Sequence, residues 1–354
     1  MKGALDLYKR ILASGALAVL CAASLMTASQ ATPARASVSL TGAGSSFDFP
    51  FFDKAFSVYQ SSHSVSINYQ PIGSGAGIQQ FTAKTVDFGA SDVPMNPVSE
   101  LPAAVKAGGA VLQIPVALGG VSVAYNVPGV KTGLHLNGTV LAKIFLGTIS
   151  KWNDRAIKAL NKKVSLPDTQ ITVVHRSDGS GTSYIFTDYL SKVSDQWRGL
   201  AGTGKLPNWP TGIGEKGNPG VADLIRSTPG TIGYVELAYV IQTHMHQAML
   251  ENRKHNFLVP NLKTVAAAAA SFPKVTSEKF SIVNGSGKNA YPIAGYSWAL
   301  VFKHQTDSTK GKALVNLMKW TVTTGQKYAK NLQYVPLPSG VQKLGTSLLK
   351  TATF

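Results

Sequence analysis

The sequence predicts an α/β fold in which strands run through glycine-rich turns into helices. This pattern occurs three times, with turns at 42–47, 72–81 and 176–183. At the third turn, the β-branched run 171–174 comes before RSDGSGTS and the apolar, helix-like run 184–190 follows it. Units of this kind form sheets that bind ligands at the carboxyl ends of their strands. We therefore expect the three turns to build one ligand site.

The turn at 176–183 contains the residue types that bind an anion. The first N–H groups of a helix have no intrahelical partner, and the helix dipole adds positive potential there. Gly179 and Gly181 let the backbone approach an oxyanion closely. Ser180 and Thr182 add hydroxyl donors, and Arg176 adds a fixed charge. Asp178 would repel an anion, so we expect its carboxylate to hold the Arg176 guanidinium. Taken alone, the stretch also fits a capped helix with a surface Arg-Asp pair.

The first 36 residues have the pattern of a secretory signal peptide. Basic residues precede the apolar run 11–26, and Ala34-Arg35-Ala36 forms an A-x-A cleavage pattern. The apolar run is shorter than the ~20 residues that span a membrane. We expect cleavage after Ala36 and a soluble mature chain. A lipoprotein signal at Cys21 is the alternative, but Leu20 stands where such signals usually have a small residue.

Composition limits the function classes. At 354 residues, with 44% hydrophobic and 14% charged residues, the chain is long enough for two globular domains. Cys21 is the only cysteine, so a mature chain has no disulfide and no thiolate metal site. The net charge is +17, and removal of residues 1–36 lowers it by 3 to +14. Because the basic residues form no long run, the charge does not predict nucleic-acid binding.

Elements in the first third follow from period and turn signals. We expect a strand at 38–40, a helix carrying Phe52, Phe56 and Tyr59, a strand at 64–70, a short helix at 79–81, a strand at 86–90 and a long β stretch at 112–127. Gly119-Gly120 inside that stretch predicts a bend where the chain crosses to a second domain.

Later elements are predicted in the same way. We expect two short helices within 139–160, an extended loop at 202–220 before a helix at 221–226, a strand at 231–235, a helix at about 236–250 and a helix around the alanines 266–270. A β stretch at 291–302 then returns to the first domain, and helices at 309–323 and 338–350 finish the chain. The predicted organisation is a signal peptide at 1–36, lobe I at 37–118, lobe II at 119–290 and a lobe I return segment at 291–354.

Six stretches together resemble one family, the periplasmic phosphate-binding component of the high-affinity phosphate ABC transporter. They are LTGAGSSF (40–47), NYQPIGSGAG (68–77), TVDFGASDVPM (85–95), FLGTISKWND (145–154), VVHRSDGSGTSYIFTDYLSKV (173–193) and TPGTIGYVELAY (228–239). The resemblance implies a periplasmic-binding-protein fold with two hinged lobes and a cleft between them. It also implies a monomeric periplasmic protein, without cofactor or metal, that delivers phosphate to the permease and ATPase subunits of an ABC transporter.

The resemblance places the phosphate-binding residues on both lobes. The matching positions are Ser46, Phe47, Ser74 and Asp92 on lobe I, and Arg176, Ser180, Gly181 and Thr182 on lobe II, with Asp178 in support. Ser46 stands where members often have Thr, which keeps the hydroxyl. The segment 48–50 is bulkier and more acidic than the usual small residues there.

Asp92 is the residue expected to set selectivity. At pH 7 phosphate still carries a proton that a carboxylate can accept, whereas sulfate has none and would face an unpaired negative charge. That mismatch costs about 1–3 kcal/mol or more. The alternative for Asp92 is the N-cap of a helix containing Pro94.

Three other functions fit the sequence less well. A hydrolase of phosphate esters would need a nucleophile with a base or a metal cluster, and the sequence contains no H-E-x-x-H, P-loop or G-x-S-x-G motif. His244 and His246 are expected on a helix surface, and His175 should point away from Arg176. Another oxyanion such as sulfate would favour a site without Asp92. A purely structural envelope protein would not need the three turns. We therefore expect a binding protein and not an enzyme.

Overall fold

The computed structural model describes residues 38–354, and the predicted signal peptide at 1–36 lies outside them. The helices are α1 (Phe49–Ser62), α2 (Ser74–Thr82), α3 (Glu100–Gly108), α4 (Gly138–Phe145), α5 (Arg155–Leu160), α6 (Gly181–Val193), α7 (Asp195–Leu200), α8 (Gly217–Ser227), α9 (Leu237–Gln242), α10 (Leu262–Ala270), α11 (Ser308–Val322) and α12 (Ser339–Leu349). The strands are β1 (Val38–Gly44), β2 (Val65–Gln70), β3 (Phe88–Ser91), β4 (Val111–Asn126), β5 (His135–Leu136), β6 (Thr172–Arg176), β7 (Ile213–Glu215), β8 (Thr231–Glu236), β9 (His246–Gln247), β10 (Met249–Glu251), β11 (Phe257–Leu258) and β12 (Ala294–Phe302).

Eight strands form a continuous series in the order β2-β1-β3-β12-β4-β8-β6-β7, and β9 also pairs with β4. The pairs of β1 with β2 and β3 are parallel, as are those of β6 with β7 and β8. The pairs made by β12 and β4 within the series are antiparallel. The predicted α/β class is therefore confirmed.

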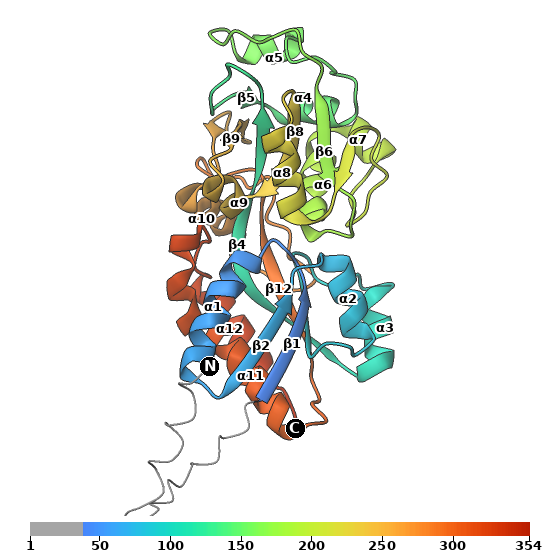
Figure 1. Cartoon of the computed structure of the whole chain (residues 1–354), viewed down its shortest axis with the longest axis vertical. Helices are drawn as coiled ribbons and strands as arrows, with labels where there is room; N and C mark the ends of the chain where they lie inside the picture. The colour runs from blue at the N-terminus through green and yellow to red at the C-terminus, as the bar shows by residue number, and fades with distance from the viewer. Residues whose placement is uncertain (1–37) are drawn as a thin grey trace, which may run out of the picture. The chain divides into compact units, whose positions relative to one another are not determined.

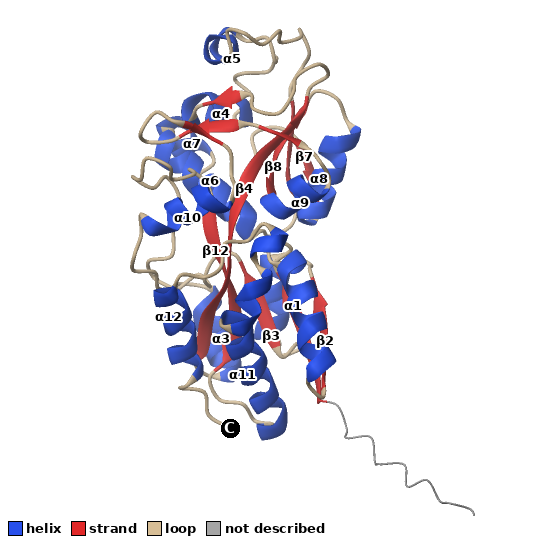
Figure 2. Ribbon diagram, turned by 90° about the vertical axis from the view of Figure 1, so that its left-hand side faces the viewer, coloured by secondary structure: helices blue, strands red, loops and turns tan. Residues whose placement is uncertain are grey.

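Strand β4 belongs to both halves of this series. Its residues up to Gly120 pair with β12, and from Val121 onward they pair with β8. The elements β1–β3, α1–α3, β12, α11 and α12 thus form a first lobe, and α4–α9 with β6–β8 form a second, as Figures 1 and 2 show. The partner change falls at the predicted bend, because neither Gly119 nor Gly120 has a side chain to obstruct it.

Helix α1 illustrates how the lobes acquire their cores. Phe52, Phe56 and Tyr59 recur at helical spacing and are buried. Phe52 and Phe56 stack with ring centroids 4.5 Å apart, and Phe56 meets Phe88 of β3 edge to face at 5.9 Å. The predicted helix therefore packs on the sheet, and its start is held at the carboxyl end of β1.

Two sequence predictions in the second lobe were wrong. The stretch 202–220 is not all loop, because β7 pairs with β6 and α8 already begins at Gly217. The helix expected at about 236–250 ends at Gln242, since the chain then turns back to pair β9 with β4. In both places sheet pairing outweighs the local helix or loop pattern.

Because α9 ends at Gln242, the prediction that His244 and His246 lie on a helix surface is wrong. His244 adopts a left-handed backbone (φ 54°) and His246 belongs to β9, so neither lies on a helix surface. Within residues 38–354, no helix is both long enough and apolar enough to cross a membrane.

Candidate functional site

The start of helix α6 forms the centre of the candidate site. Strand β6 ends at Arg176, and Ser180 caps α6 by accepting the N–H of Ser183 at 3.0 Å. The N–H of Ser180 in turn donates to the carbonyl oxygen of Lys205 at 2.8 Å. These bonds fix the turn and leave the N-terminal end of α6 facing the first lobe.

The buried Arg176 forms an ion pair with the half-buried Asp178 beside this helix start. The Arg176 Nε and Nη2 donate to the two Asp178 oxygens at 2.7 and 2.5 Å, and Arg176 is only 2% exposed. The N–H of Gly217, at the start of α8, also donates to Asp178 Oδ1 at 3.0 Å. Burial opposes ionisation, but the hydrogen bonds and charge of Arg176 outweigh it, so the pKa of Asp178 is lowered. Asp178 thus lies where the sequence places a partner for Arg176.

The first lobe contributes the ends of β1 and β3 and the start of α2. Ser46 follows β1, Ser74 is the first residue of α2, and Asp92 follows β3. All three are buried, at 1%, 1% and 2% exposure. Because β1 and β3 are parallel neighbours, their carboxyl ends bring Ser46 and Asp92 to the same edge of the sheet.

Residues of the two lobes meet directly at this edge. Thr182 Oγ1 donates to Asp92 Oδ2 at 3.1 Å, and the N–H of Gly181 donates to Ser74 Oγ at 3.1 Å. Arg176 Nη1 lies 3.5 Å from Thr182 Oγ1. Six of the eight predicted binding residues therefore lie in one cluster of polar groups: Ser46, Ser74, Asp92, Arg176, Gly181 and Thr182.

The remaining two predicted residues occupy the edge of the cluster. The ring of Phe47 is fully buried in the core and meets Tyr334, with centroids 6.3 Å apart. Its N–H donates to Ser45 Oγ at 2.9 Å. The Ser180 oxygen accepts the cap bond described above, which leaves its hydroxyl proton to donate.

Asp92 is buried among hydrogen-bond donors. Its side chain accepts from Ser45 and Thr182, and Ser297 Oγ lies 3.2 Å from Oδ1. Burial raises the pKa of Asp92 to about 6, against the opposing effects of the Ser45 bond and the Arg176 charge. The alternative role as a helix N-cap is wrong, because the next helix, α3, begins only at Glu100.

Asn218 is a member of the cluster that the sequence analysis missed. It is fully buried near the start of α8, and its Nδ2 donates to Ser46 Oγ at 3.0 Å and to Thr182 Oγ1 at 3.3 Å. Its backbone N–H also donates to Ser46 Oγ at 3.0 Å. The signal is a fourth glycine-rich helix start, GEKGNPG at 214–220, inside the stretch 202–220 that the sequence pattern predicts as a loop.

Three helices, α2, α6 and α8, begin at the cluster. Their first N–H groups add positive potential there without a formal charge. The only cationic side chain among the predicted binding residues, Arg176, is already paired with Asp178. The arrangement therefore suits a multiply charged oxyanion that accepts many hydrogen bonds, and Asp92 suits one that carries a proton.

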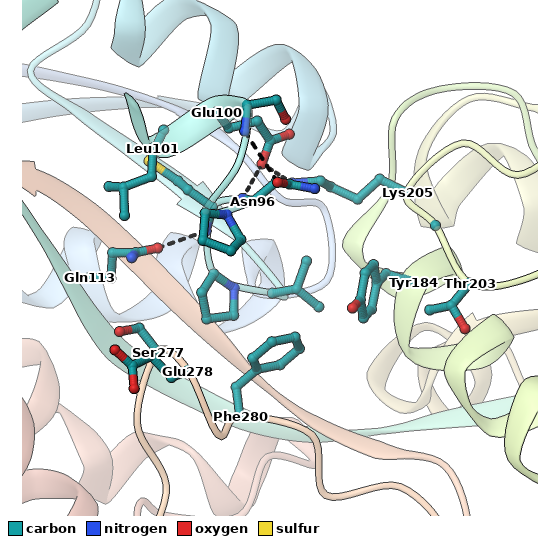
Figure 3. Close-up of a pocket in the computed structure, with 16 residues that line it drawn as sticks. Asn96, Glu100, Leu101, Gln113, Tyr184, Thr203, Lys205, Ser277, Glu278 and Phe280 are labelled. Carbon is teal, nitrogen blue, oxygen red and sulfur yellow. Dashed lines mark hydrogen bonds and ion pairs between the residues drawn. The ribbon is translucent and has the colours of Figure 1, made fainter. Parts of the chain in front are cut away.

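A pocket of about 420 Å³ lies beside the cluster, between residues of both lobes (Figure 3). Val93, next to Asp92, and Lys205, which holds Ser180, are part of its wall. Lys205 Nζ donates to Glu100 Oε2 at 2.5 Å across the lobes, and Gln113, Tyr184 and Phe280 complete much of the lining. Burial lowers the pKa of Lys205, although Glu100 opposes this shift. Among residues 38–354, no three metal-ligating side chains are grouped to hold a metal ion.

Comparison with known proteins places the chain in a family. A family model described as the PBP superfamily domain matches residues 29–323. The phosphate-binding protein PstS of Xylella fastidiosa (strain Temecula1) is 44% identical over 310 residues, which cover 87% of this chain and 84% of that protein. The chain belongs to the PstS family of phosphate-binding proteins.

A further PstS relative agrees with this assignment, and solved structures share the fold. The PstS protein of the archaeon Methanocaldococcus jannaschii is 40% identical over 311 residues, covering 81% of this chain and 79% of that protein. The phosphate-binding protein of Stenotrophomonas maltophilia shares the fold with a TM-score of 0.69, at 18% identity, covering 88% of this chain and 93% of that one. A human phosphate-binding apolipoprotein gives a TM-score of 0.70 at 18% identity, with 86% and 92% covered. The predicted two-lobed fold is confirmed.

Proposed function

We propose that this protein captures inorganic phosphate between its lobes and delivers it to an ABC-type permease. The observation that carries the proposal is the buried carboxylate of Asp92 at the centre of a cluster otherwise made of donors. The 44% identity to a PstS protein over most of both chains supports the same ligand.

The donors recognise the phosphate oxygens and Asp92 recognises the phosphate proton. The helix starts at Ser74, Gly181 and Asn218 supply N–H groups, and Ser46 and Thr182 supply hydroxyls. Arg176 supplies the fixed positive charge, and Asp178 holds its guanidinium in a single orientation. With a pKa of about 6, Asp92 is ionised at neutral pH and accepts the proton that phosphate keeps.

Capture works by closure of the lobes. Ligand contacts made by both lobes at once favour the closed form over the open one. We place the lobe boundaries where the sequence predicts them, at 118/119 and 290/291, beside the Gly119-Gly120 bend. The mature chain is then an exported monomer that begins at Ser37, works in the periplasm without a cofactor, and has the permease and ATPase subunits as partners.

Titration calorimetry on protein that lacks residues 1–36 tests this function. The protein is first unfolded and refolded to remove retained ligand, and phosphate is injected with and without excess sulfate. We expect one phosphate per chain, bound with unchanged affinity in sulfate. No heat with phosphate would refute the proposal.

The Asp92→Asn variant tests how the ligand is selected. The neutral amide accepts the phosphate O–H more weakly than a carboxylate does, and it no longer repels sulfate. We therefore expect weaker phosphate binding and sulfate competition increased by about 10- to 100-fold, which corresponds to about 1–3 kcal/mol. Competition calorimetry measures both effects. If the variant excludes sulfate as well as the natural protein does, Asp92 is not the selecting residue.

A further inference from the structure

Asp48 is a second buried carboxyl group behind Asp92. It lies in the segment 48–50, where the sequence departs from the small residues usual in the family, and it is fully buried. It occupies the N-cap position of α1, yet its side chain makes no cap hydrogen bond. An Asp at this position normally accepts a helix N–H, so the carboxyl of Asp48 has a different set of partners.

Those partners are two hydroxyl groups, one from strand β2 and one from strand β12. Tyr69 Oη lies 3.1 Å from Asp48 Oδ1, and Ser297 Oγ lies 2.6 Å from Oδ2. Both hydroxyls also have a second neighbour: Tyr69 Oη donates to the carbonyl oxygen of Ser45 at 2.7 Å, and Ser297 Oγ lies 3.2 Å from Asp92 Oδ1. Asp48 and Asp92 are thus joined through a single hydroxyl.

The number of protons on these groups limits how many of the contacts are hydrogen bonds. A hydroxyl has one proton to donate, and a carbonyl oxygen can only accept. When Tyr69 donates to Ser45, its contact with Asp48 is a hydrogen bond only if Asp48 Oδ1 carries a proton. Similarly, Ser297 can satisfy both carboxyl groups only if Asp48 donates to it. With Asp48 ionised, the two hydroxyl protons fill only two of these four contacts, and acceptors face each other in the other two. A proton on Asp48 fills one of those two.

The groups around Asp48 bring no positive charge into contact with it. Besides Tyr69 on β2 and Asp92 after β3, the titratable groups near enough to interact are Tyr239 of α9 and Tyr334, which precedes α12. The nearest cation of the cluster, Arg176, is paired with Asp178. Burial first and the charge of Asp92 second raise the pKa of Asp48 well above its usual value. Two neighbouring carboxyl groups that cannot both ionise separate into one charged and one neutral group.

We propose that Asp48 is the protonated partner of the ionised Asp92, and that loss of its proton at alkaline pH weakens phosphate binding. The inference rests on the proposed function and adds a determinant of it that does not touch the ligand. An ionised Asp48 would add a buried negative charge behind Asp92 and oppose the arrival of an anion. Phosphate binding and protonation of Asp48 therefore favour each other.

The Asp48→Asn variant tests this inference, since the amide resembles a neutral carboxyl group at every pH. Phosphate dissociation constants are measured from pH 6 to pH 9.5 for the natural protein, Asp48→Asn and Asp53→Asn. Asp53 is an exposed residue of the same helix, so its variant makes the same change in net charge away from the site. We expect the phosphate affinity of Asp48→Asn, divided by that of the natural protein, to rise from near one at pH 6 to about tenfold at the alkaline end. A tenfold ratio corresponds to a difference of about one unit in the pKa of Asp48 between the free and the phosphate-bound protein. The Asp53→Asn ratio should stay constant.

A second measurement needs no variant. Calorimetry in buffers of different ionisation enthalpy gives the number of protons taken up per phosphate, and it is made above pH 8, where phosphate itself is nearly all doubly charged. We expect net uptake of up to one proton by the natural protein and less by Asp48→Asn.

Two other outcomes of these measurements would contradict the inference. Parallel affinity profiles without proton uptake would show that the site senses no charge at Asp48. Tighter binding by Asp48→Asn at every pH would show that Asp48 is ionised throughout. Absence of phosphate binding by the natural protein at any pH would instead overturn the proposed function, so the two failures are distinguishable.

Discussion

The guanidinium of Arg176 is held by two hydrogen bonds to the Asp178 carboxylate and is almost fully enclosed. A buried charge without its partner costs several kcal/mol, so each residue depends on the other. Asp178 also accepts the N–H of Gly217 and thereby ties the start of α8 to the same turn. One carboxylate thus orients both the charge and the helix that carries Asn218.

Replacement of Asp178 by Asn should therefore affect folding in a pH-dependent way. The folded pKa of Asp178 lies below the unfolded value of about 3.9, so its stabilisation is present above that pH and is lost as the pH falls through the folded pKa. We expect Asp178→Asn to lower the free energy of unfolding by about 1–3 kcal/mol at pH 7. Denaturant titration from pH 7 to pH 3 measures the difference, which should shrink below pH 4. A difference that stays constant would contradict the ion-pair explanation.

At the scale of elements, the site depends on how closely the start of α6 approaches the first lobe. An added Cβ on Gly181 would lie 2.6 Å from Asp92 Cβ and 2.8 Å from Ser74 Oγ. The turn before α6 is equally close, since Gly75 donates its N–H to the carbonyl oxygen of Gly179 at 2.7 Å. Glycine is required at these positions because backbone meets backbone, not because of an unusual dihedral angle.

Gly181→Ala should consequently impair closure and not folding. The clash is with the opposite lobe, so it arises only when the lobes are together. We expect phosphate affinity to fall at least tenfold while the thermal midpoint of ligand-free protein changes by no more than about 2 °C. The matched control is Gly199→Ala in α7, where an added Cβ has no heavy-atom contact within 4 Å. Equal affinity losses in both variants would refute the steric explanation.

At the scale of the whole molecule, the pair of Lys205 and Glu100 links the lobes beside the site. It joins the start of α3 to the loop whose carbonyl oxygen holds Ser180. The side chains are 14% and 24% exposed, so water screens the pair only in part. The contact stabilises the closed arrangement and has no counterpart in separated lobes.

Lys205→Met keeps much of the side-chain volume and removes this link. We expect phosphate to dissociate about two- to fivefold faster, which corresponds to about 0.5–1 kcal/mol. Stopped-flow displacement measures the rate. Lys151→Met, which removes the more exposed pair with Asp168, is the control and should leave the rate unchanged. If Glu100→Gln and Lys205→Met have additive effects in the double variant, the pair contributes nothing to closure.

The sequence predicted elements well where local pattern and sheet pairing agree. The period of Val65, Ile67 and Tyr69 matched β2, and the glycine-rich turn after β6 matched the start of α6. It failed at β7 and after Gln242, where partners distant in the sequence determine the structure. A short strand has too few residues for its period to stand out from a loop.

Residues of the candidate site were predicted where a glycine-rich turn follows a strand that the sequence pattern also predicts. Asn218 needed the correct start of α8, and Ser297 lies on an apolar strand that gives no polar signal. Asp48 was noted as unusual, but its pairing with Asp92 through Ser297 depends on how β12 lies between β3 and β4. Such pairing follows from topology and not from spacing along the chain.

The shared strand β4 also affects the order in which the protein can fold during synthesis. Strand β3 needs β12 as its second neighbour, and β12 begins only at Ala294. The β6–β8 pairs of the second lobe are complete by Glu236, when the first lobe still has an open sheet edge. The lobe whose first strands are made first is therefore completed last.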